Sequence, residues 1–401
     1  MARPVDLSQL TQEIAGMRNL LSSLRRHFHT FPELSGEEKE TAAFIAGHLE
    51  ALGLKVERGV GGHGVVGVLA GTRAGPTLGY RADMDALPIQ DTLEKPYSSV
   101  RLGVKHACGH DVHMAIALGV AELLSRRTDR FGGRVVFFFQ PAEESLDGAR
   151  AMIQSGVLSD YHLSSLLALH AFPIPAGSFG IHPDLCLAGM EEFRVRFYAP
   201  AGNLEELIAH ASARLVSLST GSPPQDAVEF RELARQMVEG DALRKTIFLS
   251  CWPHTEGSLP PWHLLGLVSM TDFAYRPEVR AQIHKTLDAV VAGYGATYDL
   301  DYTFTNPPLR NHRPLVERIS PVLEEVIAPS GVITFRDPYP FAHEDFAIFA
   351  EMVPSAFIWL GTANPEAGIP SLLHTPAYDV DEEALAVGTK AMTAVLLHLL
   401  D

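Results

Sequence analysis

The stretch that decides the fold is residues 135–144, which read VVFFFQPAEE. Its first five residues are β-branched or aromatic, and such an unbroken run predicts a strand that is buried on both faces. The chain then turns at Pro141 and presents two adjacent carboxylates, Glu143 and Glu144. Open α/β sheets bind their ligands at the carboxyl ends of their strands. We therefore expect an α/β sheet with a functional site at this end of the strand.

Further apolar runs and amphipathic segments lie on both sides of this stretch. Strands are predicted at 65–69, 77–81 and 166–170, and helices at 7–28, 37–53, 113–127 and 382–400. Because strands alternate with helices, we expect a sheet whose two faces are both covered.

The pattern changes near residue 190, where polar and apolar residues begin to alternate. From there to residue 304 we predict strands at 191–198, 246–252, 264–270 and 297–303, and helices at 204–218, 226–239 and 277–292. This order is typical of a small α+β, ferredoxin-like sandwich. The sequence thus predicts an α/β domain formed by residues 1–190 and 305–401, interrupted by an inserted α+β domain at 191–304.

Composition excludes several classes of protein. The 401 residues include 48 acidic and 32 basic side chains, a formal net charge of −16, and 46% are hydrophobic, too many for a disordered chain. The acidic excess argues against nucleic acid and anionic membranes as partners, since both favour clustered Lys and Arg. No run of 18 apolar residues and no signal peptide stands out, and three cysteines are too few for a disulfide framework. We expect a soluble, cytoplasmic protein.

The densest chemical cluster is HACGHDVH at residues 106–113. If this segment is extended, Cys108 and His110 point the same way and can hold one or two metal ions from one side. A thiolate with an imidazole suits zinc, manganese, cobalt or nickel. The spacing is not that of a structural zinc finger, because no second ligand pair completes it. An ordinary histidine-rich loop is the alternative.

Other candidate residues follow predicted strands. Of Glu143 and Glu144, one can ligate a metal while the other takes a proton from metal-activated water, although the residues alone do not say which. An aspartate of RADMDALP (residues 81–88) can ligate a metal or orient a ligand histidine. His170 is predicted to end a strand, and His374 stands in a late Leu-His-Thr-Pro motif. A solvated acidic turn and ordinary single histidines are the alternatives.

Seven motifs resemble those of the M20 metallopeptidases, specifically their amidohydrolase branch, which includes hippurate hydrolase, aminoacylases and auxin-conjugate hydrolases. In chain order they are RRHFHTFPELSGEE, YRADMDALPI, HACGHDVHMA, QPAEES, LALHAFP, HEDF and LLHTPAYD. The resemblance implies a zinc-aminopeptidase-like catalytic domain with an inserted lid, which corresponds to residues 191–304.

The resemblance also orders the candidate residues. It implies that two divalent metal ions are held by Cys108, His110, Glu144, His170 and His374, with Cys108 as the bridging ligand. Glu143 matches the general acid/base, which takes a proton from the attacking water and passes it to the leaving amine. Asp85 matches the aspartate behind the ligands.

The lid departs from the family pattern. A glycine-rich loop with a histidine, which in the family reaches across a dimer interface towards the substrate, is missing after residue 198, and residues 226–239 add helical sequence. The arginine that normally holds the substrate carboxylate aligns with Asp272. His210, His254 and His263 are candidates to replace the lost histidine. Because a carboxylate there repels an anion, we expect a substrate whose amine side is neutral, cationic or bound differently.

The expected function is therefore metal-dependent hydrolysis of a small N-acyl amino acid or related amide, with zinc or manganese preferred and cobalt or nickel as further candidates. A homodimer through the lid is part of this expectation. Two alternatives stay open from the sequence: a catalytically silent relative that binds a metal or ligand, and a deaminase-type hydrolase that uses the same two metals.

Overall fold

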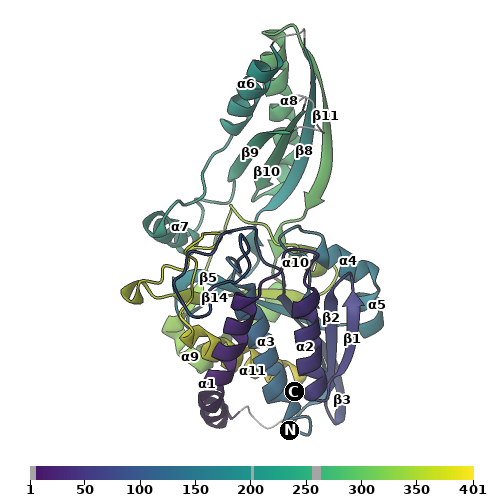
Figure 1. Cartoon of the computed structure of the whole chain (residues 1–401), viewed down its shortest axis with the longest axis vertical. Coiled ribbons are helices and arrows are strands. Elements are labelled where there is room, and N and C mark those ends of the chain that lie inside the picture. Colours follow the sequence, from purple (N-terminus) through teal and green to yellow (C-terminus); the bar gives the residue numbers. More distant parts are fainter. Residues whose placement is uncertain (1–5, 200–202, 255–262) are drawn as a thin grey trace.

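The computed structural model describes residues 6–199, 203–254 and 263–401, and it shows a larger body with a smaller domain, called the lid below, standing on one end (Figure 1). The body is built on an 8-stranded sheet in the order β1-β2-β4-β3-β5-β14-β6-β13. Its strands are β1 (Lys55–Val60), β2 (Gly64–Ala70), β3 (Arg73–Asp83), β4 (Gly132–Gln140), β5 (Ser165–Pro175), β6 (Phe179–Ile181), β13 (Val332–Thr334) and β14 (Ser355–Ala363). The pairs β4–β3, β3–β5 and β5–β14 at its centre are parallel.

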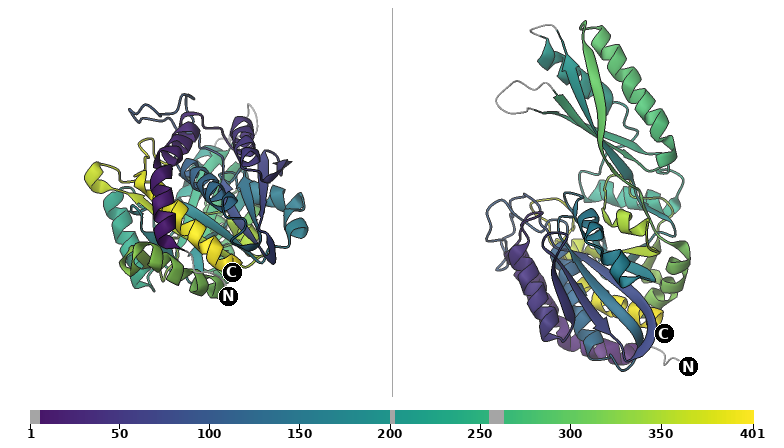
Figure 2. Two further views of the ribbon diagram at one scale, coloured as in Figure 1. Left: turned by 90° about the horizontal axis from the view of Figure 1, so that it is seen from below. Right: turned by 90° about the vertical axis from the view of Figure 1, so that its right-hand side faces the viewer.

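Helices cover both faces of this sheet and form two separate hydrophobic cores (Figure 2). One core contains α1 (Leu7–Thr30), α2 (Lys39–Ala51), α3 (His110–Ser125), α9 (Arg313–Ile327) and α11 (Glu383–Leu400). The other contains α4 (Gly148–Gln154), α5 (Val157–Tyr161), α7 (Ala227–Glu239) and α10 (Phe346–Ala350). Within β4, Val135 and Phe137 join the first core while Val136 and Phe138 join the second. The strand is therefore buried on both faces, as its sequence predicts.

Among the described residues one helix, α11, is long and apolar enough to cross a membrane by those two criteria, but 78% of it is buried inside the protein. The core accounts for its apolar character.

The lid contains a four-stranded sheet in the order β11-β8-β10-β9. Its elements are β8 (Gly189–Tyr198), α6 (Leu204–Val216), β9 (Ile247–His254), β10 (His263–Met270), α8 (Arg276–Ala292) and β11 (Thr297–Asn306). The helices α6 and α8 share one hydrophobic core with one face of this sheet. In chain order the first and third strands are neighbours, which is the split arrangement of ferredoxin-like folds.

Short elements complete the fold. They are the two-stranded pair β7 (Leu185–Leu187) with β12 (Leu309–Arg310), and the 3-10 turns η1 (Phe273–Tyr275), η2 (Pro329–Gly331) and η3 (Pro365–Ala367).

Helix α7 packs on a different domain from the one to which the predicted boundaries assign it. It falls inside the segment 191–304, yet its buried residues Phe230, Leu233 and Met237 belong to a core of the body. The Phe230 ring lies edge-on to Phe172 of β5, with 5.1 Å between ring centroids. The amphipathic pattern predicted this helix correctly, but it does not indicate which core receives the apolar face.

Candidate active site

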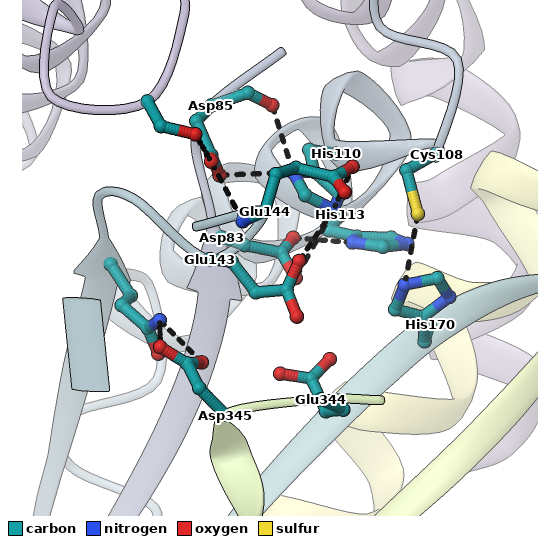
Figure 3. A network of polar contacts seen from close by, with 12 residues as sticks. Asp83, Asp85, Cys108, His110, His113, Glu143, Glu144, His170, Glu344 and Asp345 are labelled. Atoms are coloured by element: carbon teal, nitrogen blue, oxygen red, sulfur yellow. Dashed lines mark hydrogen bonds and ion pairs between the residues drawn. The ribbon is translucent and has the colours of Figure 1, made fainter. Parts of the chain in front are cut away.

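The catalytic and metal-ligand residues that the sequence predicts gather at the end of the body that faces the lid. Figure 3 labels all of them except His374. They come from β5 and from the segments that follow β3, β4 and β14, all at one edge of the parallel part of the sheet. This is where α/β sheets place their sites, because the carboxyl ends of parallel strands meet there.

Cys108 and His110 do not lie in one extended segment, contrary to the prediction. Gly109 separates them with a φ of 91°, and His110 is the first residue of α3. A Cβ on Gly109 would lie 2.6 Å from the Tyr378 hydroxyl and 2.7 Å from Cβ of Ala171. Only glycine fits this turn, so the two ligand atoms meet through a left-handed residue rather than through strand alternation.

Asp85 holds His110 in place from behind. The Nδ1 atom of His110 donates to the backbone carbonyl of Asp85 at 2.8 Å and lies 3.3 Å from its carboxylate. The same carboxylate accepts hydrogen bonds from the Ser35 hydroxyl at 2.6 Å and from the backbone N–H of Glu144 at 2.9 Å. Nε2 of His110 is thus left to face the other ligands, and Asp85 connects two of them.

Asp83, the other aspartate of the 81–88 motif, already has partners. Arg81 donates to it at 2.5 Å, and His113 Nδ1 lies 2.5 Å from its other oxygen. Since His113 Nε2 accepts a hydrogen bond from the Ala171 N–H, its proton is on Nδ1 and is donated to Asp83. Burial alone would raise the pKa of Asp83, but Arg81, His110 and His113 together outweigh burial and hold that pKa well below its usual range.

Glu143 and Glu144 follow β4 in a tight turn in which Ala142 has a φ of 53°. Their carboxylates each lie 3.8 Å from His110 Nε2. Burial, Glu344 and Glu144 raise the pKa of Glu143 well above its usual range. Burial is also the largest cause that raises the pKa of Glu144 to about 8.

The two remaining candidate ligands, His170 and His374, face the cysteine. His170 Nε2 lies 3.6 Å from Cys108 Sγ, and His374 Nε2 lies 3.3 Å from it. His374 Nε2 is also 3.8 Å from the Glu144 carboxylate. His170 does not end its strand as predicted: β5 continues to Pro175, because the residues after His170 are again apolar and pair with β14.

These residues fit divalent metal ions. Ligand atoms of Cys108, His110 and Glu144 lie within 4.8 Å of one another. Among the described residues, His110 Nε2 and Glu144 Oε1 are buried without a hydrogen-bond partner, a costly state that a shared cation would relieve. Burial would lower the pKa of His110, yet Asp83 and Asp85 raise it to about 10, which reflects a surplus of negative charge around the imidazole. Thiolate, imidazole and carboxylate ligands together suit borderline transition metals.

A cavity of about 590 Å³ opens onto this cluster. The body contributes the reactive groups Cys108, Glu143, Glu144, His170 and His374 to its lining. The lid contributes Met190, Glu192 and Leu267, and Pro223 and Pro224 come from the connection between α6 and α7. The cavity therefore lies between body and lid.

The four substrate-binding candidates do not line this cavity. Asp272 accepts a hydrogen bond from the Ala274 N–H and caps η1. His210 lies on α6 beside Tyr294, and His254 and His263 pair across β9 and β10. The Asp272 alignment therefore does not place a carboxylate in the cavity of this chain.

Sequence reasoning missed a buried ionic network beneath Glu143. Arg81 donates to Glu344 at 2.8 Å and to Asp345 at 3.2 Å, and Gln140 donates to Asp345 at 2.7 Å. The signal was present in the HEDF motif at residues 343–346, which has two adjacent acids before an apolar segment. The partner of Glu344, Arg81, lies 263 residues earlier in the chain.

Comparisons with known proteins agree with this geometry. Residues 79–398 match the model of peptidase family M20/M25/M40. "Probable hydrolase sll0100" of Synechocystis sp. is 33% identical over 390 residues, which are 93% of this chain and 94% of that protein. An N-acetyl-L-cysteine deacetylase of Bacillus subtilis is 30% identical over 414 residues, covering 100% of this chain and 91% of the relative.

A solved structure is similar over nearly the whole length. It is the YXEP protein of Bacillus subtilis, described as a dinuclear metal-binding peptidase of the M20 family, with a TM-score of 0.75 and 27% identity. The match covers 96% of this chain and 99% of that one. The chain belongs to peptidase family M20/M25/M40, and it is a metal-dependent hydrolase of amide carbon–nitrogen bonds.

Proposed function

We propose that this protein removes the acyl group from a small N-acyl amino acid or related amide, with Glu143 as general acid/base. The observation that carries this proposal is the position of Glu143. Its buried carboxylate lines the cavity and lies 3.8 Å from His110 Nε2, beside the cluster of candidate ligands.

Two divalent ions are part of the proposal, zinc or manganese first, with cobalt and nickel as further candidates. Cys108, His110, Glu144, His170 and His374 would hold them, with Cys108 shared between the two ions, since His170 and His374 both face its sulfur. Ions held there lower the pKa of water and polarise an amide carbonyl.

The protein groups then have distinct tasks. Glu143 accepts a proton from the attacking water and delivers it to the leaving nitrogen, a role that a raised carboxyl pKa favours. Asp85 keeps the His110 ring in its orientation through Nδ1. The lid side of the cavity covers the reacting amide and limits access of bulk water.

The test is Glu143→Gln, which keeps the shape of the side chain and removes its basicity. We expect kcat to fall roughly 10²–10⁴-fold on N-acyl amino acids while bound metal is retained. Glu317→Gln, an exposed residue of α9, is the matched control and should leave kcat unchanged. An unchanged rate in Glu143→Gln would contradict the assignment. Metal binding without hydrolysis of any amide would favour a silent relative, and ammonia release from an aromatic amine would favour a deaminase.

Cytoplasmic location, a small-molecule substrate without nucleic acid or membrane partners, and a homodimer through the lid complete the proposal. Cys108, Cys186 and Cys251 are all free thiols, which suits a reducing compartment. The dimer is tested by measuring the molar mass in solution of the wild type and of a variant that is altered in an edge strand of the lid sheet.

A further inference from the structure

The cavity between body and lid contains no basic side chain of lysine or arginine among the described residues that line it. Its charged lining consists of four carboxylates, those of Glu143, Glu144, Glu192 and Glu344. A substrate with a free carboxylate would therefore find no guanidinium or ammonium group of this chain to pair with there.

Three of these carboxylates already have tasks or partners. Glu143 and Glu144 belong to the reactive cluster, and Glu344 accepts hydrogen bonds from Arg81 at 2.8 Å and from the Phe346 N–H at 3.0 Å. Glu192 is different: it is exposed, and no hydrogen bond or ion pair to it is found in the described part of the chain.

No cationic side chain in the described part of the chain pairs with Glu192 at the cavity. It lies on β8 between Leu267 of β10 and Phe304 of β11. The nearby cation, Arg150, lies over the Phe304 ring at 5.6 Å and forms no ion pair with Glu192. Partial burial and Asp147 raise the pKa of Glu192, and no lysine or arginine acts against this shift.

The remaining walls of the cavity suit a substrate that has an apolar chain and a cationic group. Phe172 and Trp359 stack at 4.2 Å, and Tyr339, Phe341 and Phe357 add further rings. Aromatic faces attract cations through their quadrupoles, and they also cover methylene chains.

We propose that the amine side of the substrate carries a positive charge, and that Glu192 pairs with this charge. This inference rests on the proposed amidohydrolase function. Because Glu192 belongs to the lid and the reactive cluster to the body, the charge is separated from the scissile amide by a stretch of apolar chain. N-acyl diamines and related N-acyl compounds with a distant ammonium group are the substrate class.

Three substrates of similar length test this proposal on the metal-loaded full-length protein. They are N-acetyl-1,4-diaminobutane (cationic), N-acetylbutylamine (neutral) and N-acetyl-4-aminobutyrate (anionic). We expect kcat/KM to be roughly three- to tenfold higher for the cation than for the neutral compound, and lowest for the anion. Glu192→Gln should remove the advantage of the cation through KM, and Glu192→Lys should reverse the order of cation and anion.

Glu278→Gln is the matched control, because Glu278 is an exposed lid glutamate on α8 that does not line the cavity. It should leave all three rates unchanged. A preference for the anion, or a cation preference that survives in Glu192→Gln, overturns the inference while the amidohydrolase function stands.

Binding provides a readout that does not depend on turnover. Calorimetry on metal-loaded Glu143→Gln should show tighter binding of 1,4-diaminobutane than of butylamine, and the difference should vanish when Glu192→Gln is added. Equal binding of the two amines overturns the inference. Failure of every N-acyl compound to react in wild type, together with selective diamine binding, would instead contradict the proposed function.

Discussion

At the scale of single residues, Asp85 connects the chemistry of the site to its architecture. It contacts His110, the Ser35 hydroxyl and the backbone of Glu144, and its side chain is buried. Carboxylates in this position orient metal ligands and raise the basicity of those ligands. Their loss therefore lowers the affinity for the metal more than it disturbs the fold.

Asp85→Asn is therefore expected to lower metal affinity about 10–100-fold. Competition with a chelating dye measures this change, and thermal unfolding of the metal-free protein checks that the fold is kept. Asp129→Asn, an exposed aspartate after α3, should leave affinity as it is in wild type. Equal affinities in both variants would mean that Asp85 has no part in holding the ligands.

A second residue-scale prediction concerns acid stability. His182 is buried against the Phe335 ring, with 5.1 Å between ring centroids, and burial lowers its pKa to about 3 although Asp337 opposes the shift. Between pH 3 and an unfolded pKa of about 6.5, the unfolded chain binds the proton and the folded chain does not. The contribution of the neutral His182 to stability is thus fully present above about pH 6.5, and it is lost as the pH falls towards 3.

Replacing His182 by Phe should make unfolding less sensitive to acid, by up to about 1.4 kcal/mol per pH unit in this window. Urea unfolding at pH 7 and pH 5 measures the difference. The exposed His398→Phe should keep the acid sensitivity of wild type. A His182→Phe variant that loses stability with acid as steeply as wild type would contradict the assignment.

At the scale of elements, a buried ionic network joins α1 to the segments that carry two of the ligands. Arg25 of α1 is fully buried and donates to Asp111, next to His110, at 2.8 Å and to Asp379, five residues after His374, at 2.9 Å. His29 lies 2.7 Å from the same oxygen of Asp111. The RRHFHTFPE motif thus supports the site without contacting the cavity.

Arg25→Met should destabilise the protein by about 3–5 kcal/mol, because it leaves Asp111 and Asp379 buried without their cation. Urea unfolding measures this loss. Arg18→Met on the same helix removes an exposed pair with Glu383 and should cost about 1 kcal/mol or less. Similar losses in the two variants would show that the buried network does not contribute as described.

The elements were largely predictable from the sequence, because β4 and α3 are apolar along their length and the lid strands alternate polar and apolar residues. What periodicity could not show was where the chain turns within a motif. The left-handed Gly109 changes the direction between Cys108 and His110, and the polar His170 interrupts an apolar run without ending its strand. Likewise, Asp272 aligns with a substrate-binding position but is used as a helix cap.

Residues far apart in the sequence were the other limit. The resemblance to the family supplied the roles of Glu143 and Glu144, which adjacent carboxylates alone do not distinguish. Glu344 lies on a late segment of the chain that folds back beside Glu143. Only the folded structure shows that Arg81 pairs with Glu344. Glu192 gave no signal at all, since an exposed glutamate on an alternating strand is ordinary.

At the scale of the whole molecule, the net charge of −16 gains a meaning that composition did not give it. The cavity has four glutamates and no lysine or arginine among its described lining residues, so the acidity extends into the site. A field of this sign favours the approach of cations, both metals and the proposed substrates, and salt should weaken that approach.

Helix α7 has a mechanical consequence. The chain leaves the lid after α6, packs α7 on the body, and returns to the lid at β9, so the described lid is tied to the body by two more passages than a simple insertion has. One of these passages carries Pro223 and Pro224 into the cavity wall, and α7 itself touches Phe172 in the same wall. A rotation of the lid relative to the body would therefore either move α7 with it or strain the cavity wall that contains Phe172.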